Sequence, residues 1–210
     1  MIKRWIGNTF LRVAGWEKRG ERPPVDRYVI IAAPHTSNWD MPFMLAAAFV
    51  YDIPVRWMGK HTLFKAPFGP FFKALGGIPI IRHRPGGVVG QMVEHFANNE
   101  SLVLMVPAEG TRSHVDYWKS GFYHIARGAN VPVVLSFLDF GKKVTGIGPA
   151  IELTGDYTAD MDKIREFYSG MQGLHPEKVG VMRLREEDAA ELLEQDDPGA
   201  EEIERLAGSL

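Results

Sequence analysis

The sequence predicts an α/β fold in which a mostly parallel central sheet is flanked by helices. Three observations lead to this fold class: apolar runs of strand type at residues 28–33, 77–81 and 102–106, the polar loop after each run, and the helix-type pattern after each loop. Strands that alternate with helices in this way are typical of parallel sheets. Because the loops after parallel strands gather at the carboxyl edge of the sheet, where ligands bind, we expect the active site at that edge.

The composition indicates one domain with a sizeable core. The chain has 210 residues, of which 45% are hydrophobic and 24% charged. It contains no cysteine, which excludes disulfides, thiolate metal sites and a cysteine nucleophile and fits a reducing cytoplasm. Residues 174–210 carry 11 acidic and 4 basic side chains, so within a net charge of −2 the first 173 residues have a balance of +5. A basic body suits an anionic partner such as a phosphate, coenzyme A, an acidic carrier protein or lipid headgroups.

The first 16 residues have the pattern of an amphipathic helix. The apolar side chains that fall on one side of its helical wheel are Ile2, Trp5, Ile6, Phe10 and Val13. Two interpretations stay open: the helix packs on the domain, or it lies in a membrane interface with its apolar side facing the lipid. No stretch has the ~20 apolar residues of a membrane span, and no signal-peptide pattern opens the chain.

The remaining elements follow from periodicity and from breaker residues. Residues 20–24, a stretch rich in breaker residues, lead into the first strand. The Phe-rich residues 63–75 pack in the core, line an acyl groove or contact a bilayer. We expect helices at 41–51, 88–98, 118–129 and 158–171, strands at 54–58 and 131–138, one or two strands at 143–154, and acidic helices at 186–195 and 200–206.

The loop after the first strand contains a histidine and an aspartate five positions apart. His35 is suited to accept a proton near neutral pH, and Asp40 can fold back to hold the other ring nitrogen and stabilise the imidazolium. The pair supplies a base and an acid without a nucleophile. The alternative is local: Asp40 caps the helix that begins at Met41, and His35 is a surface loop residue.

A cationic turn follows the second apolar run. Arg82, His83 and Arg84 precede a predicted helix. Two guanidinium groups beside a helix N-terminus fit the oxygens of a phosphate, whereas the alternative is a solvated pair of arginines.

The strand at 102–106 leads into a third ionisable loop. Gly110 would let the backbone approach a substrate closely. Glu109 offers a carboxylate to a hydroxyl, and Arg112 offers a guanidinium to a phosphate. The alternative is a structural turn closed by an internal ion pair.

These motifs together resemble the blocks of the glycerolipid acyltransferase superfamily, whose best-known members acylate lysophosphatidic acid to phosphatidic acid. Residues 35–40 match the signature of a histidine, four residues and an aspartate. Residues 77–82 resemble the second block, 107–113 the third and 131–134 the fourth. The four blocks occur in family order within residues 28–138. The resemblance implies a fold like that of glycerol-3-phosphate acyltransferase.

The resemblance also implies a role for each motif residue. His35 would be the general base that takes a proton from the acceptor hydroxyl as it attacks an acyl thioester, and Asp40 would hold and polarise His35. The residues that would bind the acceptor are Arg82, Glu109, Gly110, Thr111 and Arg112, with both arginines on its phosphate. Transfer would be direct, with no acyl-enzyme, no metal and no cofactor. Backbone amides at the helix start after His35 would stabilise the oxyanion.

The implied partners are a thioester co-substrate and a lipid acceptor. The donor is acyl-CoA or acyl carrier protein, and the acceptor is a lysophospholipid such as 1-acylglycerol 3-phosphate, as in phospholipid biosynthesis; no nucleic acid is involved. We expect a cytoplasmic O-acyltransferase, peripheral on the cytoplasmic membrane face. Its parts would be an amphipathic helix at 1–20, the acyltransferase domain at 21–173 and an acidic helical extension at 174–210 packed on the same domain.

The sequence departs from the family pattern at two positions, and other functions stay open. Pro34 stands where members often have asparagine, and Ala108 intervenes between Pro107 and Glu109. One alternative is acyl transfer to a different lipid, another is a metal-dependent hydrolase that uses His35, Asp40 and Glu109, and a third is a non-catalytic phospholipid-binding protein. A serine hydrolase is disfavoured, because no Gly-X-Ser-X-Gly motif is present.

Overall fold

The computed structural model describes residues 1–81 and 84–189, which form an α/β fold around a seven-stranded sheet. The strands are β1 (Glu17–Arg19), β2 (Arg27–Ala33), β3 (Val55–Lys60), β4 (Gly77–Ile80), β5 (Leu102–Val106), β6 (Val133–Asp139) and β7 (Val144–Ile151). Their order across the sheet is β1-β7-β6-β2-β5-β3-β4. Strands β2 to β6 run in one direction, whereas β7 is antiparallel to β6 and β1 is parallel to β7. The predicted mostly parallel sheet is confirmed.

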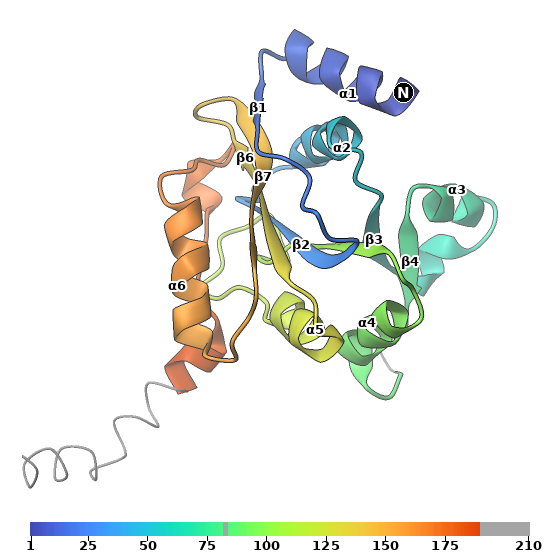
Figure 1. Cartoon of the computed structure of the whole chain (residues 1–210), viewed down its shortest axis with the longest axis vertical. Helices are drawn as coiled ribbons and strands as arrows, with labels where there is room; N and C mark the ends of the chain where they lie inside the picture. Colours follow the sequence, from blue (N-terminus) through green and yellow to red (C-terminus); the bar gives the residue numbers. More distant parts are fainter. Residues whose placement is uncertain (82–83, 190–210) are drawn as a thin grey trace, which may run out of the picture.

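Helices cover both faces of the sheet (Figure 1). On one face lie α4 (Gly87–Ala97), α5 (Gly121–Ala129) and α6 (Tyr157–Tyr168), which share a core with the sheet. On the other face lies α2 (Asp40–Val50), and α1 (Ile2–Val13) packs on its outer side. The described structure also contains two 3-10 turns, η1 (His61–Phe64) and η2 (Pro176–Lys178), and the short helix α3 (Gly69–Ala74).

The central strand β2 is buried on both faces, which explains its continuous apolar run. Val29, Ile31 and Ala33 point into the core under α4, α5 and α6. Tyr28 and Ile30 point to the opposite face. A strand covered on both sides needs apolar residues at every position, as in other parallel sheets. The strand therefore ends in the middle of the molecule, between two layers of helices.

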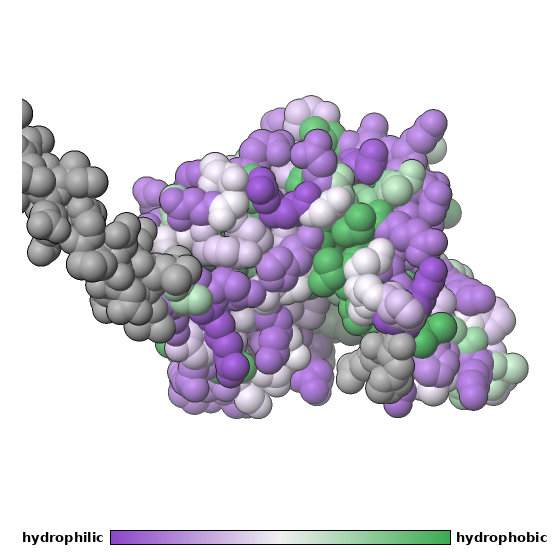
Figure 2. Space-filling model, turned by 90° about the horizontal axis from the view of Figure 1, so that it is seen from below, coloured by the Kyte–Doolittle hydropathy of each residue, from purple (hydrophilic) through white to green (hydrophobic). Residues whose placement is uncertain are grey.

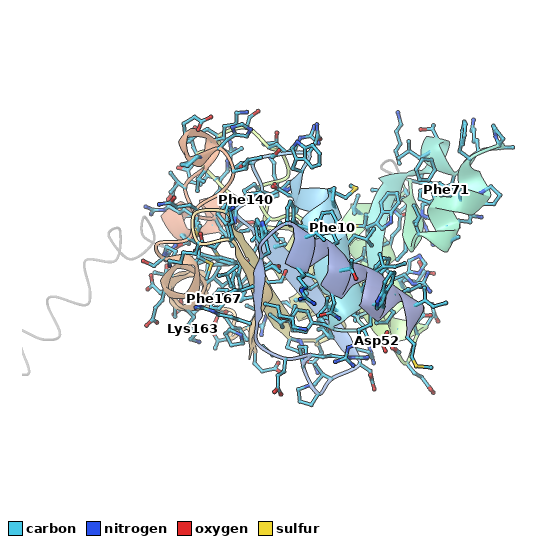
Figure 3. The ribbon with its side chains drawn as sticks, turned by 90° about the horizontal axis from the view of Figure 1, so that it is seen from above. Phe10, Asp52, Phe71, Phe140, Lys163 and Phe167 are labelled. Carbon is cyan, nitrogen blue, oxygen red and sulfur yellow. The ribbon has the colours of Figure 1, made fainter. Side chains whose placement is uncertain are left out.

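Helix α1 is fastened to α2 by its small and apolar side chains. Gly7 and Leu11 are buried, and a Cβ on Gly7 would come within 2.5 Å of a backbone carbonyl oxygen of α2. Phe10 contacts Phe43 at 5.1 Å between ring centroids, and Phe43 contacts Phe140 at 5.5 Å, which joins α1 to the β6–β7 turn (Figure 3). Much of the apolar side of α1 nevertheless stays exposed. Helix α1 therefore packs on the domain and still presents apolar side chains to its surroundings.

Several local predictions differ from the structure. Residues 63–75 form part of η1 and α3, and they are divided between rings that pack together and rings that face solvent. The strand β1 has no counterpart among the predicted elements, and residues 143–154 contain a single strand, β7. The predicted helix at 200–206 lies outside the described residues, and of the helix at 186–195 only residues up to 189 are described, in helical conformation.

Two features of the described structure concern contact with a membrane: the length of its helices and the distribution of apolar side chains on its surface. No described helix combines the length and the apolar character needed to traverse a bilayer. On the face shown in Figure 2, apolar side chains gather in a central strip between mostly polar areas.

Candidate active site

The site begins where β2 ends at the carboxyl edge of the sheet. His35 lies two residues after β2, and Asp40 is the first residue of α2. The imidazole Nδ1 lies 2.9 Å from Asp40 Oδ2, with 20% of the histidine side chain and none of the aspartate side chain exposed. The approach is not linear, since Nδ1 has no hydrogen bond of good geometry with any described group. The contact leaves Nε2 as the ring nitrogen that a substrate can reach.

Asp40 is held in place by the loop that it closes. Its Oδ2 accepts hydrogen bonds from the backbone N–H groups of Thr36 at 2.8 Å and Ser37 at 2.9 Å. These two hydrogen bonds hold the Asp40 side chain in a fully buried place at the start of α2. The alternative in which Asp40 caps the helix is wrong, because the cap position belongs to Trp39.

The backbone amides of this loop are largely used within the loop. Thr36 and Ser37 donate to Asp40, His35 donates to Glu109 Oε1, and Trp39 donates to Ser37 Oγ. The prediction that amides at this helix start stabilise an oxyanion stays a prediction, and these hydrogen bonds narrow it to few donors. In the stretch 35–40, only the N–H of Asn38 donates to no group that the structure describes.

Glu109 supports the histidine from the neighbouring strand. Glu109 reaches His35 because β2 and β5 are adjacent parallel strands, so that the loops after them lie side by side. The Glu109 side chain is buried, its Oε1 accepts the His35 N–H at 2.9 Å, and Oε2 has no hydrogen bond with any described residue. Burial raises the pKa of the Glu109 carboxyl, and the hydrogen bond from His35 offsets part of that rise. Glu109 thus faces the His35 backbone rather than open solvent.

The rest of the third block forms an exposed turn. Gly110 has a φ of 69°, in the left-handed region, and its N–H donates to the carbonyl of Pro107 at 3.1 Å. Thr111 Oγ1 accepts the N–H of Ser113. The exposed Arg112 forms no ion pair with Glu109 or with any other acid in residues 1–81 and 84–189. The alternative of an internally paired turn is wrong, and this guanidinium is available to a ligand.

The second predicted arginine cannot be placed. Arg82 lies outside the described residues. Arg84 pairs with Glu94 of α4 at 2.9 Å, so it does not present a free charge. The second block otherwise runs as predicted, from strand β4 into α4.

Two features near the site were missed by sequence reasoning. Lys60 is the last residue of β3 and therefore lies at the same carboxyl edge as His35, with no acidic partner among the described side chains. Its position at a strand end was a usable signal. The second feature is a strap, defined as residues 172–184, for which the sequence holds no local signal.

The strap connects the loops of the site. The N–H of His175 donates to Thr36 Oγ1 at 3.1 Å, and a Cβ on Gly173 would lie 2.7 Å from the same oxygen. Farther along, the N–H of Val181 donates to the carbonyl of Val115 at 2.9 Å, beyond the Glu109–Arg112 turn. The strap therefore ties the histidine loop to the segment after the third block.

The arrangement offers base chemistry rather than a metal centre. In the part of the chain that the structure describes, no group of three or more His, Asp or Glu side chains is placed to hold a metal ion. The carboxylates of Asp40 and Glu109 each face backbone N–H groups, so the proposed ligand set with His35 is not supported.

An apolar cavity of about 20 Å³ lies between α2 and the sheet, and it starts near the site at Ala32 and Met44. This volume holds about one water molecule and no alkyl chain. Apolar side chains at the start of α2 are instead open to solvent; they are Trp39, Met41 and Leu45.

Comparison with known proteins places this geometry in a family. Residues 15–135 match the Acyltransferase family, which covers more than half of the chain. The fold is similar to the crystal structure of the 1-acyl-sn-glycerophosphate (LPA) acyltransferase PlsC from Thermotoga maritima, with a TM-score of 0.52 and 18% identity over 79% of this chain and 74% of that chain. No functionally curated protein matches the sequence. With the paired His35 and Asp40 inside the matched region, the chain belongs to the acyltransferase family, within the glycerolipid acyltransferase superfamily.

Proposed function

We propose that the protein transfers a fatty acyl group from a thioester, acyl-CoA or acyl carrier protein, to the hydroxyl of a lysophospholipid such as 1-acylglycerol 3-phosphate. The observation that carries this proposal is the contact of 2.9 Å between His35 Nδ1 and the buried Asp40, which leaves Nε2 free to accept a proton. Because a thioester is already activated, a positioned general base, which contributes about 10²- to 10⁴-fold to the rate, is sufficient for this reaction.

The proposed reaction needs only groups of this chain and the two substrates. His35 Nε2 takes the proton of the acceptor hydroxyl while the hydroxyl oxygen attacks the thioester carbonyl carbon. The tetrahedral intermediate collapses, the carbon–sulfur bond breaks, and the thiolate leaves with the proton from the imidazolium. Asp40 balances the charge on His35 during both steps. The free N–H of Asn38 is the remaining loop amide that fits the oxyanion.

Cations at the same edge support a phosphate-bearing substrate. Arg112, in the loop after β5, is exposed and has no acidic partner in the described chain. Lys60 is the last residue of β3, the strand next to β5 in the sheet. A guanidinium matches the oxygens of a phosphate. Arg82 belongs to the same proposal by its place in the second block. These charges favour an acyl acceptor that carries phosphate over a neutral one.

We further propose that the protein works at a lipid surface. Three segments expose large apolar side chains: α1 with Ile2, Trp5, Ile6 and Val13, the start of α2 with Trp39, Met41 and Leu45, and residues 63–75 with Leu63, Phe68, Phe71 and Leu75. Basic residues accompany them, among them Lys3 and Lys73. The cavity under α2 is too small for an alkyl chain, so a lipid tail does not fit there, whereas these exposed apolar side chains fit a bilayer surface.

The catalytic proposal is tested with labelled acyl-CoA or acyl carrier protein and a panel of lysolipids, with products read by mass spectrometry. His35→Ala is expected to abolish turnover without loss of acceptor binding. The matched control is His124→Ala, because His124 also contacts a carboxylate, Glu186, at 3.2 Å but lies on α5 away from the loop. Unchanged turnover in His35→Ala, or lipid binding with no turnover in the wild type, would favour a phospholipid-binding protein instead.

The membrane proposal is tested by liposome sedimentation. A double substitution of Trp5 and Ile6 by serine spares the buried Gly7 and Leu11, so α1 keeps its packing on α2. We expect weaker binding to anionic vesicles, whereas Val181→Ser, at an exposed apolar residue of the strap, should bind as the wild type does. Equal sedimentation of all three proteins would exclude α1 as a lipid contact.

A further inference from the structure

Lys119 lies beside the Glu109–Arg112 turn and is fixed there by its backbone. Its N–H donates to the carbonyl of Ala108 at 2.7 Å, directly before Glu109. The preceding Trp118 is buried, and its N–H donates at 2.8 Å to the strap carbonyl of Arg183. Helix α5 begins two residues after Lys119. The lysine therefore sits on a held segment rather than on a free loop.

The Lys119 side chain crosses the glycine of the turn. A Cβ on Gly110 would lie 2.8 Å from Lys119 Cγ and 3.7 Å from Cε. The methylene stem thus packs flat on the residue that has no side chain, as the stems of long cations commonly do on open surface. This contact gives Gly110 a second function besides its positive φ, and it keeps the amino group close to the turn.

The charge of Lys119 has no counter-ion in residues 1–81 and 84–189. No carboxylate lies within ion-pair distance of its amino group, and the adjacent Glu109 is buried against the His35 backbone. Arg112 in the same turn is likewise unpaired. Arg84, by contrast, is paired with Glu94. Unpaired positive charges gathered beside a base attract an anion.

We propose that Lys119 and Arg112 together form a binding site for a phosphate group of one of the two substrates. The shared chemistry is a phosphate anion, which belongs either to the acceptor or to the coenzyme A of the donor. The proposal rests on the proposed function for the identity of these substrates. It goes beyond that function by assigning Lys119, which lies outside the residues of the motif blocks.

The test measures binding, so that it can fail independently of catalysis. Lys119→Met keeps the stem on Gly110 and removes the charge, and Lys119→Arg keeps the charge. Lys163→Met is the matched control, because Lys163 is an exposed lysine on α6. Titration calorimetry at low ionic strength, with glycerol 3-phosphate and with coenzyme A as separate probes, gives a Kd for each protein. The His35→Ala variant is expected to bind both probes like the wild type.

Lys119→Met is expected to raise the Kd for one of the probes roughly 5- to 20-fold, between the effect of an exposed ion pair and that of a charge-assisted hydrogen bond, because the site is exposed. Lys119→Arg should restore most of the affinity, and added salt should reduce the difference. A change confined to glycerol 3-phosphate assigns the site to the acceptor, and one confined to coenzyme A assigns it to the donor. Unchanged Kd values for both probes, or no binding of either by the wild type, would overturn the proposal.

Discussion

Replacing Asp40 by asparagine removes one charge from the buried carboxylate while keeping its size. The remaining amide oxygen can still accept the two backbone N–H groups that now bind Oδ2, those of Thr36 and Ser37. It cannot at the same time balance a positive charge on His35. The substitution therefore separates the structural role of Asp40 in the loop from its electrostatic role in proton transfer.

The size of the effect follows from the distance between the two groups. Unit charges 2.9 Å apart interact by about 6 kcal/mol at an effective dielectric constant of about 20, which is an upper estimate of about 10⁴-fold in rate. If the contact becomes a charge-assisted hydrogen bond during proton transfer, its net value of about 1.5 to 3 kcal/mol gives a lower estimate of about 10- to 150-fold. We expect kcat to fall by roughly 10- to 10⁴-fold with little change in KM for the acceptor.

The assay follows thiol release from acyl-CoA in the presence of the acceptor identified in the lysolipid panel. Asp156→Asn is the control, because Asp156 caps α6 by accepting the N–H of Ala159 at 2.9 Å and is exposed. That variant should lose a little stability and no activity. A kcat for Asp40→Asn within threefold of the wild type, in protein that melts at the same temperature, would refute the assigned role of the carboxylate.

Three further predictions concern the support of the site. Glu109→Gln keeps an acceptor for the His35 N–H but cannot ionise. Because burial raises the pKa of Glu109, the wild type loses stability as the pH rises through that pKa. The melting temperature of the variant should therefore increase relative to that of the wild type above about pH 4.5. A constant difference across pH would contradict it. Gly7→Val drives a side chain into the backbone of α2 and should cost about 1 to 3 kcal/mol in urea unfolding; unchanged stability would show that α1 is not docked there. Gly173→Ala should lower kcat more than it raises KM, and adding Thr36→Ala, which removes the atoms nearest the new methyl group, should recover part of the loss; if the double variant is no better, the strap does not act through Thr36.

The elements that sequence reasoning predicted best are those with a local cause. Strands β2 and β5 were predicted because a strand buried on both faces must be apolar throughout. The loop from His35 to Asp40 was predicted as a base and an acid in contact, and the structure brings the two side chains to 2.9 Å. Their assigned roles in catalysis stay predictions until turnover is measured.

The features that were missed depend on contacts between distant parts of the chain. Strand β1 consists of three exposed, charged residues, Glu17–Arg19, so it has no alternation of apolar and polar residues that would predict a strand. The hydrogen bond from the His35 N–H to Glu109 Oε1 joins residues 74 positions apart in sequence, whereas the role of Glu109 in binding the acceptor stays a prediction. The hydrogen bond from His175 to Thr36 spans 139 positions and uses a backbone donor, which any residue type supplies. Such contacts carry no residue-type signal.

The strand β1 has a mechanical consequence for the N-terminal helix. It starts four residues after α1 and pairs with β7 from Glu17 to Arg19, and β7 in turn pairs with β6 in the body of the sheet. Helix α1 is therefore joined to the sheet through β1 as well as through its packing on α2. For a protein that rests on lipid through α1, the height of His35 above the headgroups is then fixed by the fold. Such a fixed height would select acceptors whose hydroxyl protrudes from the headgroups to the level of His35.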